Sequence, residues 1–159
     1  MMTSLSCKVL ARLAGKTLVT AESLTGGGIG AALTGVAGSS AVYKGGIICY
    51  TDWVKHNILG VPESMLETFG AVSRPVAESM ATNARELLRG DVAVSVTGLA
   101  GPGGDDFGNP VGTVFIGCAT EGGCEVREFH FSGDREAVRE QTLEAALDLV
   151  LEMADTPVN

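Results

Sequence analysis

The feature that most constrains the fold is an alternation of short apolar segments with segments of helical periodicity. Residues 17–21 (TLVTA) and 92–96 (VAVSV) are rich in β-branched residues, as buried strands are. Residues 74–88 carry apolar side chains at the three- and four-residue spacing of an amphipathic helix. Because parallel strands need long crossover connections, usually helices, this alternation predicts an α/β fold.

The remaining segments complete a three-layer α/β/α sandwich. Further helices are expected over residues 4–13, 28–33, 51–59 and 134–153, and further strands over residues 41–50, 111–119 and 124–131. The last two strands flank a glycine turn and are expected to form an antiparallel hairpin. We therefore predict a single domain over residues 1–159 with a mixed, mostly parallel sheet. Ligands of such sheets bind in loops beyond the carboxyl ends of the strands.

Charge and composition argue against several classes of protein. The net charge is -8 and no basic stretch is present, so neither nucleic acid nor an anionic membrane is an expected partner. No apolar run reaches the ~20 residues of a membrane span, and no signal-peptide pattern opens the chain, so a cytoplasmic location is expected. The four cysteines lack the paired spacing of a metal site, and neither a metal nor another cofactor is expected.

Three segments combine polar side chains with glycine. In the first, TAESLTGGG (residues 20–28), Ser23 stands where a strand turns into a helix. Free N–H groups at the start of a helix attract anions and developing oxyanions. The pattern alone leaves three roles open for Ser23: nucleophile, phosphate contact or helix N-cap.

The second segment, GSS at residues 38–40 together with YTDWVK at residues 50–55, offers a base. A serine attacks a carbonyl poorly unless a base takes its proton, but structural roles explain the two histidines, His56 and His130, better than catalysis does. A lysine can serve if burial lowers its pKa toward neutrality. Lys55 follows a predicted buried strand and is such a candidate, although most lysines simply face solvent.

The third segment is the loop TGLAGPGG, residues 97–104, which follows the strand VAVSV. Its backbone N–H groups could surround a phosphate or ribose, but it matches neither a Walker A sequence nor a dinucleotide fingerprint, and a plain surface loop is the alternative. Arg135 opens the last predicted helix as either a phosphate clamp or a solvated side chain.

Several blocks together resemble the C-terminal domain of the competence-damage-inducible (CinA) family, among them TAESLTGGG, GSSAVYKGG, YTDWVK, VSVTGLAGPGG and FSGDREAVR. The resemblance covers about residues 5–153. That family includes stand-alone nicotinamide mononucleotide deamidases. The resemblance therefore implies an amidohydrolase domain that hydrolyses the carboxamide of nicotinamide mononucleotide, giving nicotinic acid mononucleotide and ammonia. It also implies a serine–lysine mechanism and self-association into a dimer or larger homo-oligomer.

The resemblance also implies roles for individual residues. The implied catalytic residues are Ser40, Lys55 and Ser23, with Lys55 as general base. The implied substrate-binding residues are Tyr50, Thr97, Gly98, Gly101, Arg135, Gly26 and Gly27. Ser40 is preferred as the nucleophile because it lies one predicted strand before Lys55, which leaves Ser23 to bind substrate or relay a proton. The reverse assignment stays open.

The chain departs from the family pattern at a few positions. Leu24, Gly45 and Asp52 stand where the family usually has cysteine, arginine and asparagine. Asn109 replaces a lysine, and Asp105 and Asp106 precede it. An added carboxylate near a phosphate site would weaken binding of a mononucleotide. Two alternatives therefore remain: an amidase for another small amide, or a degenerate member that binds a pyridine nucleotide or a partner without turnover.

Overall fold

Within residues 2–155, five strands form one mixed sheet in the order β2-β1-β3-β4-β5. The computed structural model describes residues 2–155. The strands are β1 (Leu18–Glu22), β2 (Tyr43–Ile48), β3 (Val92–Gly98), β4 (Thr113–Thr120) and β5 (Gly123–His130). β1 pairs in parallel with β2 and β3, whereas β3 with β4 and β4 with β5 pair antiparallel. The predicted mixed sheet is confirmed: β4 alone opposes the other strands, although the pairings divide equally between the two kinds.

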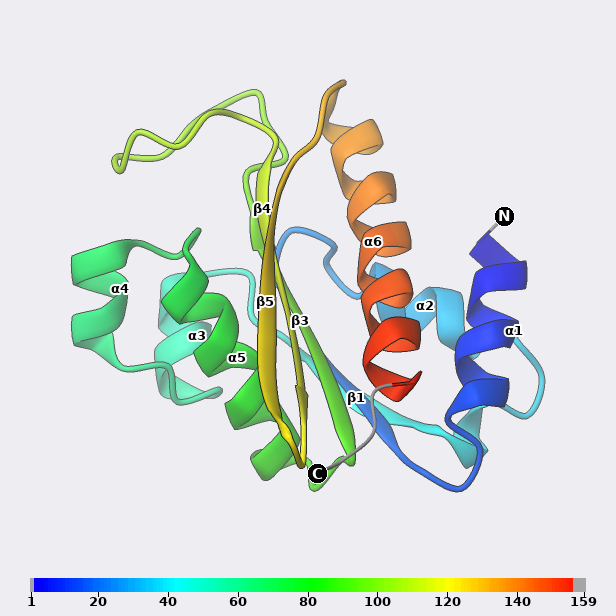
Figure 1. Cartoon of the computed structure of the whole chain (residues 1–159). Coiled ribbons are helices and arrows are strands. Elements are labelled where there is room, and N and C mark those ends of the chain that lie inside the picture. The colour runs from blue at the N-terminus through cyan, green and yellow to red at the C-terminus, as the bar shows by residue number, and fades with distance from the viewer. Residues whose placement is uncertain (1, 156–159) are drawn as a thin grey trace.

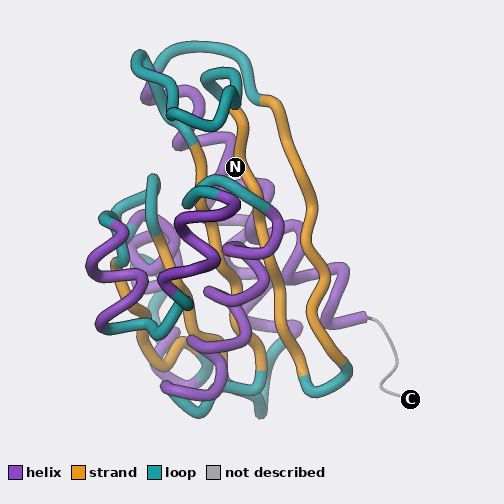
Figure 2. Tube along the Cα trace, turned by 90° about the vertical axis from the view of Figure 1, so that its left-hand side faces the viewer, coloured by secondary structure: helices purple, strands orange, loops and turns teal. Residues whose placement is uncertain are grey.

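Helices cover both faces of this sheet, which confirms the three-layer α/β/α architecture (Figure 1). One layer contains α1 (Met2–Arg12), α2 (Gly28–Thr34) and α6 (Arg135–Asp155). The other contains α3 (Asp52–Asn57), α4 (Glu63–Phe69) and α5 (Arg74–Leu87). The loop between β3 and β4 projects beyond one end of the sheet (Figure 2). No helix among residues 2–155 is long and apolar enough to cross a membrane.

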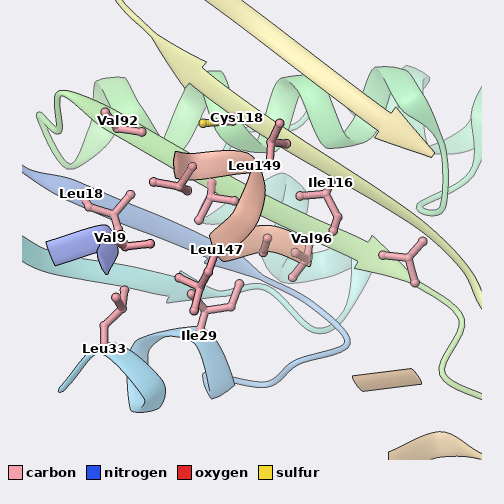
Figure 3. Packing of buried hydrophobic residues seen from close by; sticks show 14 of the residues in the cluster. Val9, Leu18, Ile29, Leu33, Val92, Val96, Ile116, Cys118, Leu147 and Leu149 are labelled. Carbon is pink, nitrogen blue, oxygen red and sulfur yellow. The ribbon is translucent and has the colours of Figure 1, made fainter. Parts of the chain in front are cut away.

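The sheet separates two apolar cores because successive side chains of a strand point to opposite faces. Leu18 of β1 packs with Val9, Ile29, Leu33 and Leu147 on the face of α1, α2 and α6 (Figure 3). Its neighbour Val19 belongs to the core under α5, with Met80, Ala81 and Ala84. Strand β1 is buried along its whole length. Because β1 is buried and paired with a strand on each side, it is a rigid support for the residues that follow it.

The segment before β2 differs from the prediction. Residues 41–50 were expected to be a strand, but Ser39–Ala41 form a short 3₁₀ helix and β2 begins at Tyr43. Gly38, with φ of +83°, caps this turn in the left-handed region that glycine adopts without strain. The strand is therefore shorter than expected and begins after Ser40.

Helix α5 lies close to the sheet at Gly117 of β4. A Cβ at this position would lie 2.9 Å from the backbone oxygen of Ala77 and 2.8 Å from Oγ of Ser95. Ser95 Oγ in turn donates a hydrogen bond of 2.7 Å to the Ala77 carbonyl. Because a backbone atom cannot swing away as a flexible side chain can, only glycine fits between β4 and α5 here.

We expect Gly117→Ala to lower the free energy of unfolding by about 1–3 kcal/mol, since the added methyl group overpacks the contact with α5. Urea denaturation measures the loss. Gly122→Ala is the matched control, because its Cβ would lie 3.7 Å from Thr120 Oγ1, an ordinary contact. The control should stay within about 0.5 kcal/mol of the wild type. An equal loss in both variants would contradict the proposed close approach.

Candidate active site

The carboxyl ends of β1, β2 and β3 meet at one edge of the sheet, as the topology predicts. Ser23 directly follows β1, Lys55 lies on α3 just after β2, and Thr97 lies near the end of β3. Helix α3 begins at an N-cap: Thr51 Oγ1 accepts a hydrogen bond of 3.5 Å from the N–H of Val54. This cap turns the chain so that α3 returns along the sheet edge.

Lys55 is buried and its amine touches two groups. The side chain is only 1% exposed. Its Nζ lies 2.9 Å from Oγ of Ser23 and 2.8 Å from the carbonyl oxygen of Cys49. A carbonyl oxygen can only accept, so a neutral amine would donate one N–H to Cys49 and keep its lone pair for the Ser23 hydroxyl. The arrangement therefore suits transfer of a proton from Ser23 to Lys55.

Burial lowers the pKa of Lys55 from its ordinary value, because the charged ammonium loses water; the nearby Cys49 and Asp52 oppose this effect. Burial also raises the pKa of the Cys49 thiol to about 11, against an opposing effect of Lys55. The thiol thus stays neutral at physiological pH, and Cys49 opposes the shift in the pKa of Lys55 only where the thiol is ionised. A lysine with a lowered pKa is a stronger candidate for a general base.

The turn that carries Ser23 is fixed by backbone contacts. The N–H of Ser23 donates 3.1 Å to the carbonyl of Val96 on β3, and the Ser23 carbonyl accepts 3.0 Å from the N–H of Gly26. From α6, Arg139 Nε donates 3.0 Å to the carbonyl of Leu24. Since β3, α6 and the turn itself all hold this segment, the serine hydroxyl is aimed at Lys55 by the tertiary structure.

A cavity of about 660 Å³ opens beside this pair, within the range of small-molecule sites. Most of the predicted site residues line it: Ser23, Lys55, Tyr50, Thr97, Gly98, Gly101 and Arg135. The loop after β3 supplies much of the wall, including Gly98–Asp106 and the half-exposed ring of Phe107. The cavity therefore gathers residues that are far apart in the chain around Ser23 and Lys55.

Arg135 joins two sides of the cavity. Its Nη1 donates 2.7 Å to the carbonyl of Gly101 in the glycine-rich loop, and its Nη2 donates 2.9 Å to the hydroxyl of Tyr50 after β2. The hydroxyl of Thr97 is already engaged, because its Oγ1 donates a hydrogen bond of 2.8 Å to the carbonyl of Ala71. The guanidinium, with five N–H donors, still has capacity to bind a further anion.

The predicted pairing of Ser40 with Lys55 is wrong within one chain. Ser40 is exposed and lies in the 3₁₀ helix before β2, whereas Lys55 contacts Cys49 just after β2. The six residues of β2 separate these points by roughly 16 Å at the usual rise of a strand. Ser40 is also absent from the cavity lining, and Ser23 takes its expected place beside the amine.

Gly26 and Gly27, predicted to contact substrate, do not line the cavity either. Both have positive φ, +59° and +103°, and shape the turn into α2. A Cβ at Gly27 would lie 3.1 Å from the side chain of Ile48, and one at Gly26 would face Arg139. Their role is conformational, since the turn needs left-handed backbone at both positions.

The part of the cavity loop that departs from the family pattern, residues 105–109, is held by its own polar residues. Asp105 Oδ1 accepts from the N–H groups of Phe107 and Asn109, each at 3.1 Å, and its Oδ2 accepts 2.7 Å from the Asn109 side chain. Slight burial acts to raise the pKa of Asp105, but the hydrogen bonds from Asn109 and Phe107 hold it below its ordinary value. Asn109 also donates 3.2 Å to the Val72 carbonyl, so this pair braces the cavity wall.

Glu22 is a buried polar residue that the sequence reasoning missed. Glu22 directly precedes Ser23 in the chain, and its buried carboxyl group accepts hydrogen bonds from the N–H groups of Ile29 and Gly30 in α2. The sequence signal that could have revealed Glu22 was a charged residue at the end of an apolar strand. Its partners lie seven and eight residues later, outside the range of the usual capping patterns.

The two histidines have partners elsewhere, and neither lines the cavity. His56 Nδ1 lies 2.8 Å from the Val61 carbonyl, and His130 Nε2 lies 2.6 Å from Glu128. Among residues 2–155, no group of three or more histidine, cysteine, aspartate or glutamate side chains could hold a metal ion.

Fold and site together define an α/β protein with a buried serine–lysine pair at the carboxyl edge of a mixed sheet. Residues 2–154 match the family model for the CinA C-terminal domain, and the chain belongs to the CinA family.

Curated relatives and solved structures agree with this membership. A CinA-like protein of Parasynechococcus marenigrum is 49% identical over 150 residues, covering 91% of this chain and 36% of that protein. For a CinA-like protein of Geobacter sulfurreducens the identity is 46% over 139 residues, covering 87% and 34%. This chain thus spans about a third of the length of these relatives.

Among solved structures, a CinA superfamily protein from Klebsiella pneumoniae is 35% identical with a TM-score of 0.94, covering 97% of this chain and 98% of that one. The competence/damage inducible protein CihA from Agrobacterium tumefaciens is 38% identical with a TM-score of 0.92, covering 98% and 96%. The fold is therefore that of the family over nearly the whole chain.

The lowered pKa of Lys55 predicts how stability depends on pH. Between the lowered folded-state pKa and the unfolded value near 10.4, the unfolded chain binds more protons, so stability should rise with pH. We expect the free energy of unfolding of the wild type, relative to Lys55→Met, to increase in this window by at most about 1.4 kcal/mol per pH unit. Urea denaturation from neutral to alkaline pH measures the difference.

The same comparison with Lys8→Met is the control, because the side chain of Lys8 is exposed and its ammonium stays hydrated. A flat difference for Lys55→Met would mean that burial does not suppress the charge on this lysine.

Proposed function

We propose that this chain is a nicotinamide-nucleotide amidase, which hydrolyses the carboxamide of nicotinamide mononucleotide to nicotinic acid mononucleotide and ammonia. The observation that carries the proposal is the contact between buried Lys55 Nζ and Ser23 Oγ at 2.9 Å, opening into the cavity. Membership of the CinA family supports the proposal, since that family includes nicotinamide mononucleotide deamidases.

The proposed chemistry has two steps. Neutral Lys55 accepts the proton of Ser23 as the serine oxygen bonds to the carboxamide carbon, and the oxyanion is held by backbone N–H groups of the glycine-rich loop. The N–H of Ser23 itself is bound to Val96, so other amides must serve. Lys55 then protonates the leaving nitrogen, the carbon–nitrogen bond breaks and ammonia departs. Water, deprotonated by Lys55, finally hydrolyses the acyl-serine and restores both side chains.

The cavity has complementary groups for a pyridinium nucleotide. Tyr50 lies at the mouth and can stack on a cationic ring, and Arg135 beside it can bind a phosphate. The carboxyl groups of Asp52 and Asp106 also line the cavity, where they favour the positive ring and oppose the phosphate. The charges that line the cavity therefore match the pyridinium ring of the substrate better than its phosphate. Self-association and a cytoplasmic location stay predictions.

We expect Ser23→Ala and Lys55→Met each to lower kcat for ammonia release from nicotinamide mononucleotide by at least about 10³-fold, because each removes one half of the proton-transfer pair. Methionine keeps the volume of the buried side chain. A coupled ammonia assay measures the rates, and circular dichroism checks that each variant folds.

Ser40→Ala is the control for this experiment and should keep kcat within about twofold, as expected of an exposed substitution. Loss of activity in Ser40→Ala with Ser23→Ala unaffected would overturn the assignment of the nucleophile. No ammonia from a folded wild type would remove the proposed substrate and favour another small amide.

We expect Arg135→Ala to raise KM for nicotinamide mononucleotide by about tenfold or more, since a charge-assisted hydrogen bond to phosphate is lost. The KM for nicotinamide riboside, which lacks the phosphate, should change far less. Arg135→Lys keeps the charge without the planar fork, so its KM for nicotinamide mononucleotide should lie between those of the wild type and Arg135→Ala. Equal increases in KM for both substrates would show that Arg135 acts by holding Gly101 and Tyr50 rather than by binding phosphate.

A further inference from the structure

Glu22 is a buried acidic side chain with several hydrogen-bond donors around it. It ends β1, directly before Ser23, and is 2% exposed. Its Oε1 accepts 2.7 Å from the hydroxyl of Thr25 and 2.8 Å from the N–H of Ile29. Its Oε2 accepts 3.1 Å from the N–H of Gly30 and a longer 3.4 Å contact from the hydroxyl of Thr20. Every partner donates to a carboxyl oxygen, so both oxygens of Glu22 act as hydrogen-bond acceptors.

These contacts close the turn that carries Ser23. The turn runs from the end of β1 to the start of α2, through two left-handed glycines that give it little rigidity of its own. The carboxyl group binds the first turn of α2 to the last residue of β1, and Thr25 in the middle of the turn is bound to the same oxygen. Ser23 therefore lies inside a loop whose two ends and centre are held by one side chain.

The backbone of Glu22 reaches the lysine as well. Its carbonyl oxygen accepts 2.8 Å from the N–H of Cys49 and a weaker contact of 3.7 Å from the Cys49 thiol. The carbonyl of Cys49 in turn accepts 2.8 Å from Lys55 Nζ. One residue thus contacts both the serine turn and the segment that orients the amine.

An apolar residue at this position would avoid the cost of burying a carboxyl group. It would, however, leave the N–H groups of Ile29 and Gly30 and the hydroxyl of Thr25 without these partners, and the turn without its clamp. Apolar packing cannot supply directional contacts of this kind, whereas a carboxylate accepting backbone N–H groups makes short and strong ones.

We propose that Glu22 is a positioning residue for catalysis: its buried carboxyl group clamps the turn between β1 and α2 and so holds Ser23 Oγ against Lys55 Nζ. The proposal rests on the serine–lysine pair of the proposed function. Glu22 touches neither reacting group through its side chain, so its effect is on the geometry of the nucleophile and should appear in kcat rather than in KM.

Glu22→Gln is the sharpest variant. The amide has nearly the same volume, but one oxygen becomes an NH₂ group. Since both oxygens accept a backbone N–H, either orientation of the amide sets two donors against each other and opens one end of the clamp. Ser95→Ala is the matched control: it also removes a fully buried hydrogen bond from the sheet, 2.7 Å to Ala77, away from the turn.

The experiment measures three quantities on the wild type and both variants, at a temperature where urea curves show all three folded. These are the rate of Ser23 labelling by a fluorophosphonate probe, read by mass spectrometry, and kcat and KM for ammonia release. For Glu22→Gln we expect labelling and kcat to fall by about tenfold or more, because small displacements of a reacting group cost up to ~10²-fold, with KM within about twofold. Ser95→Ala should keep all three near the wild-type values.

Several outcomes would overturn the proposal. Wild-type labelling and kcat in Glu22→Gln would do so, and so would an equal loss in Ser95→Ala, which would reveal a general effect of stability. If Glu22→Gln does not fold, Thr25→Val removes a single donor to the same carboxyl group and should give a smaller drop in labelling; no drop would count against the clamp.

The probe separates this inference from the proposed function. A wild type that is labelled at Ser23 but releases no ammonia from nicotinamide mononucleotide would refute the substrate, and the labelling rates would still decide the role of Glu22. A wild type that releases ammonia without labelling at Ser23 would refute the nucleophile, and the positioning role with it.

Discussion

The burial of one amine, that of Lys55, is the interaction on which the site depends. Taking an ammonium out of water is costly, and within residues 2–155 the partners of this one are a carbonyl and a hydroxyl rather than a carboxylate. Lys55 is nevertheless buried, because the short capped helix α3 that carries it lies at the carboxyl ends of the strands. The same burial shifts the lysine toward its neutral form, which is the form that can take a proton from a serine.

The position of Ser23, the proposed nucleophile, depends on contacts from several sides of its turn. β3 binds the N–H of Ser23, α6 binds the carbonyl of Leu24 through Arg139, and Glu22 binds α2 back to β1. Such a turn loses little entropy when substrate binds, because it is already ordered. The open side of the cavity differs, since exposed Tyr50, Phe107 and Arg135 line it and can adjust to a ligand.

The departures from the family pattern fall mainly on that open side. Asp52, Asp105 and Asp106 line the cavity wall or mouth, whereas the pair itself lies beneath. Asp105 is occupied in bracing the loop through Asn109. Under the proposed function, the chemistry and the recognition of substrate would be carried by separate parts of the site, and changes in the loop could alter substrate preference without disturbing the serine and the lysine.

The sequence by itself determined the three-layer architecture, the mixed sheet and the candidacy of Lys55, Ser23 and Arg135, because hydrophobic periodicity and motif order are local properties of the chain. It did not determine which serine meets the lysine. Ser40 is nearer in sequence but lies at the opposite end of β2, whereas Ser23 directly follows the neighbouring parallel strand β1, whose carboxyl end lies beside that of β2. Nor did it reveal Glu22, whose partners lie across a turn. Only the tertiary structure decided these points, because strand pairing brings together residues that the chain itself keeps apart.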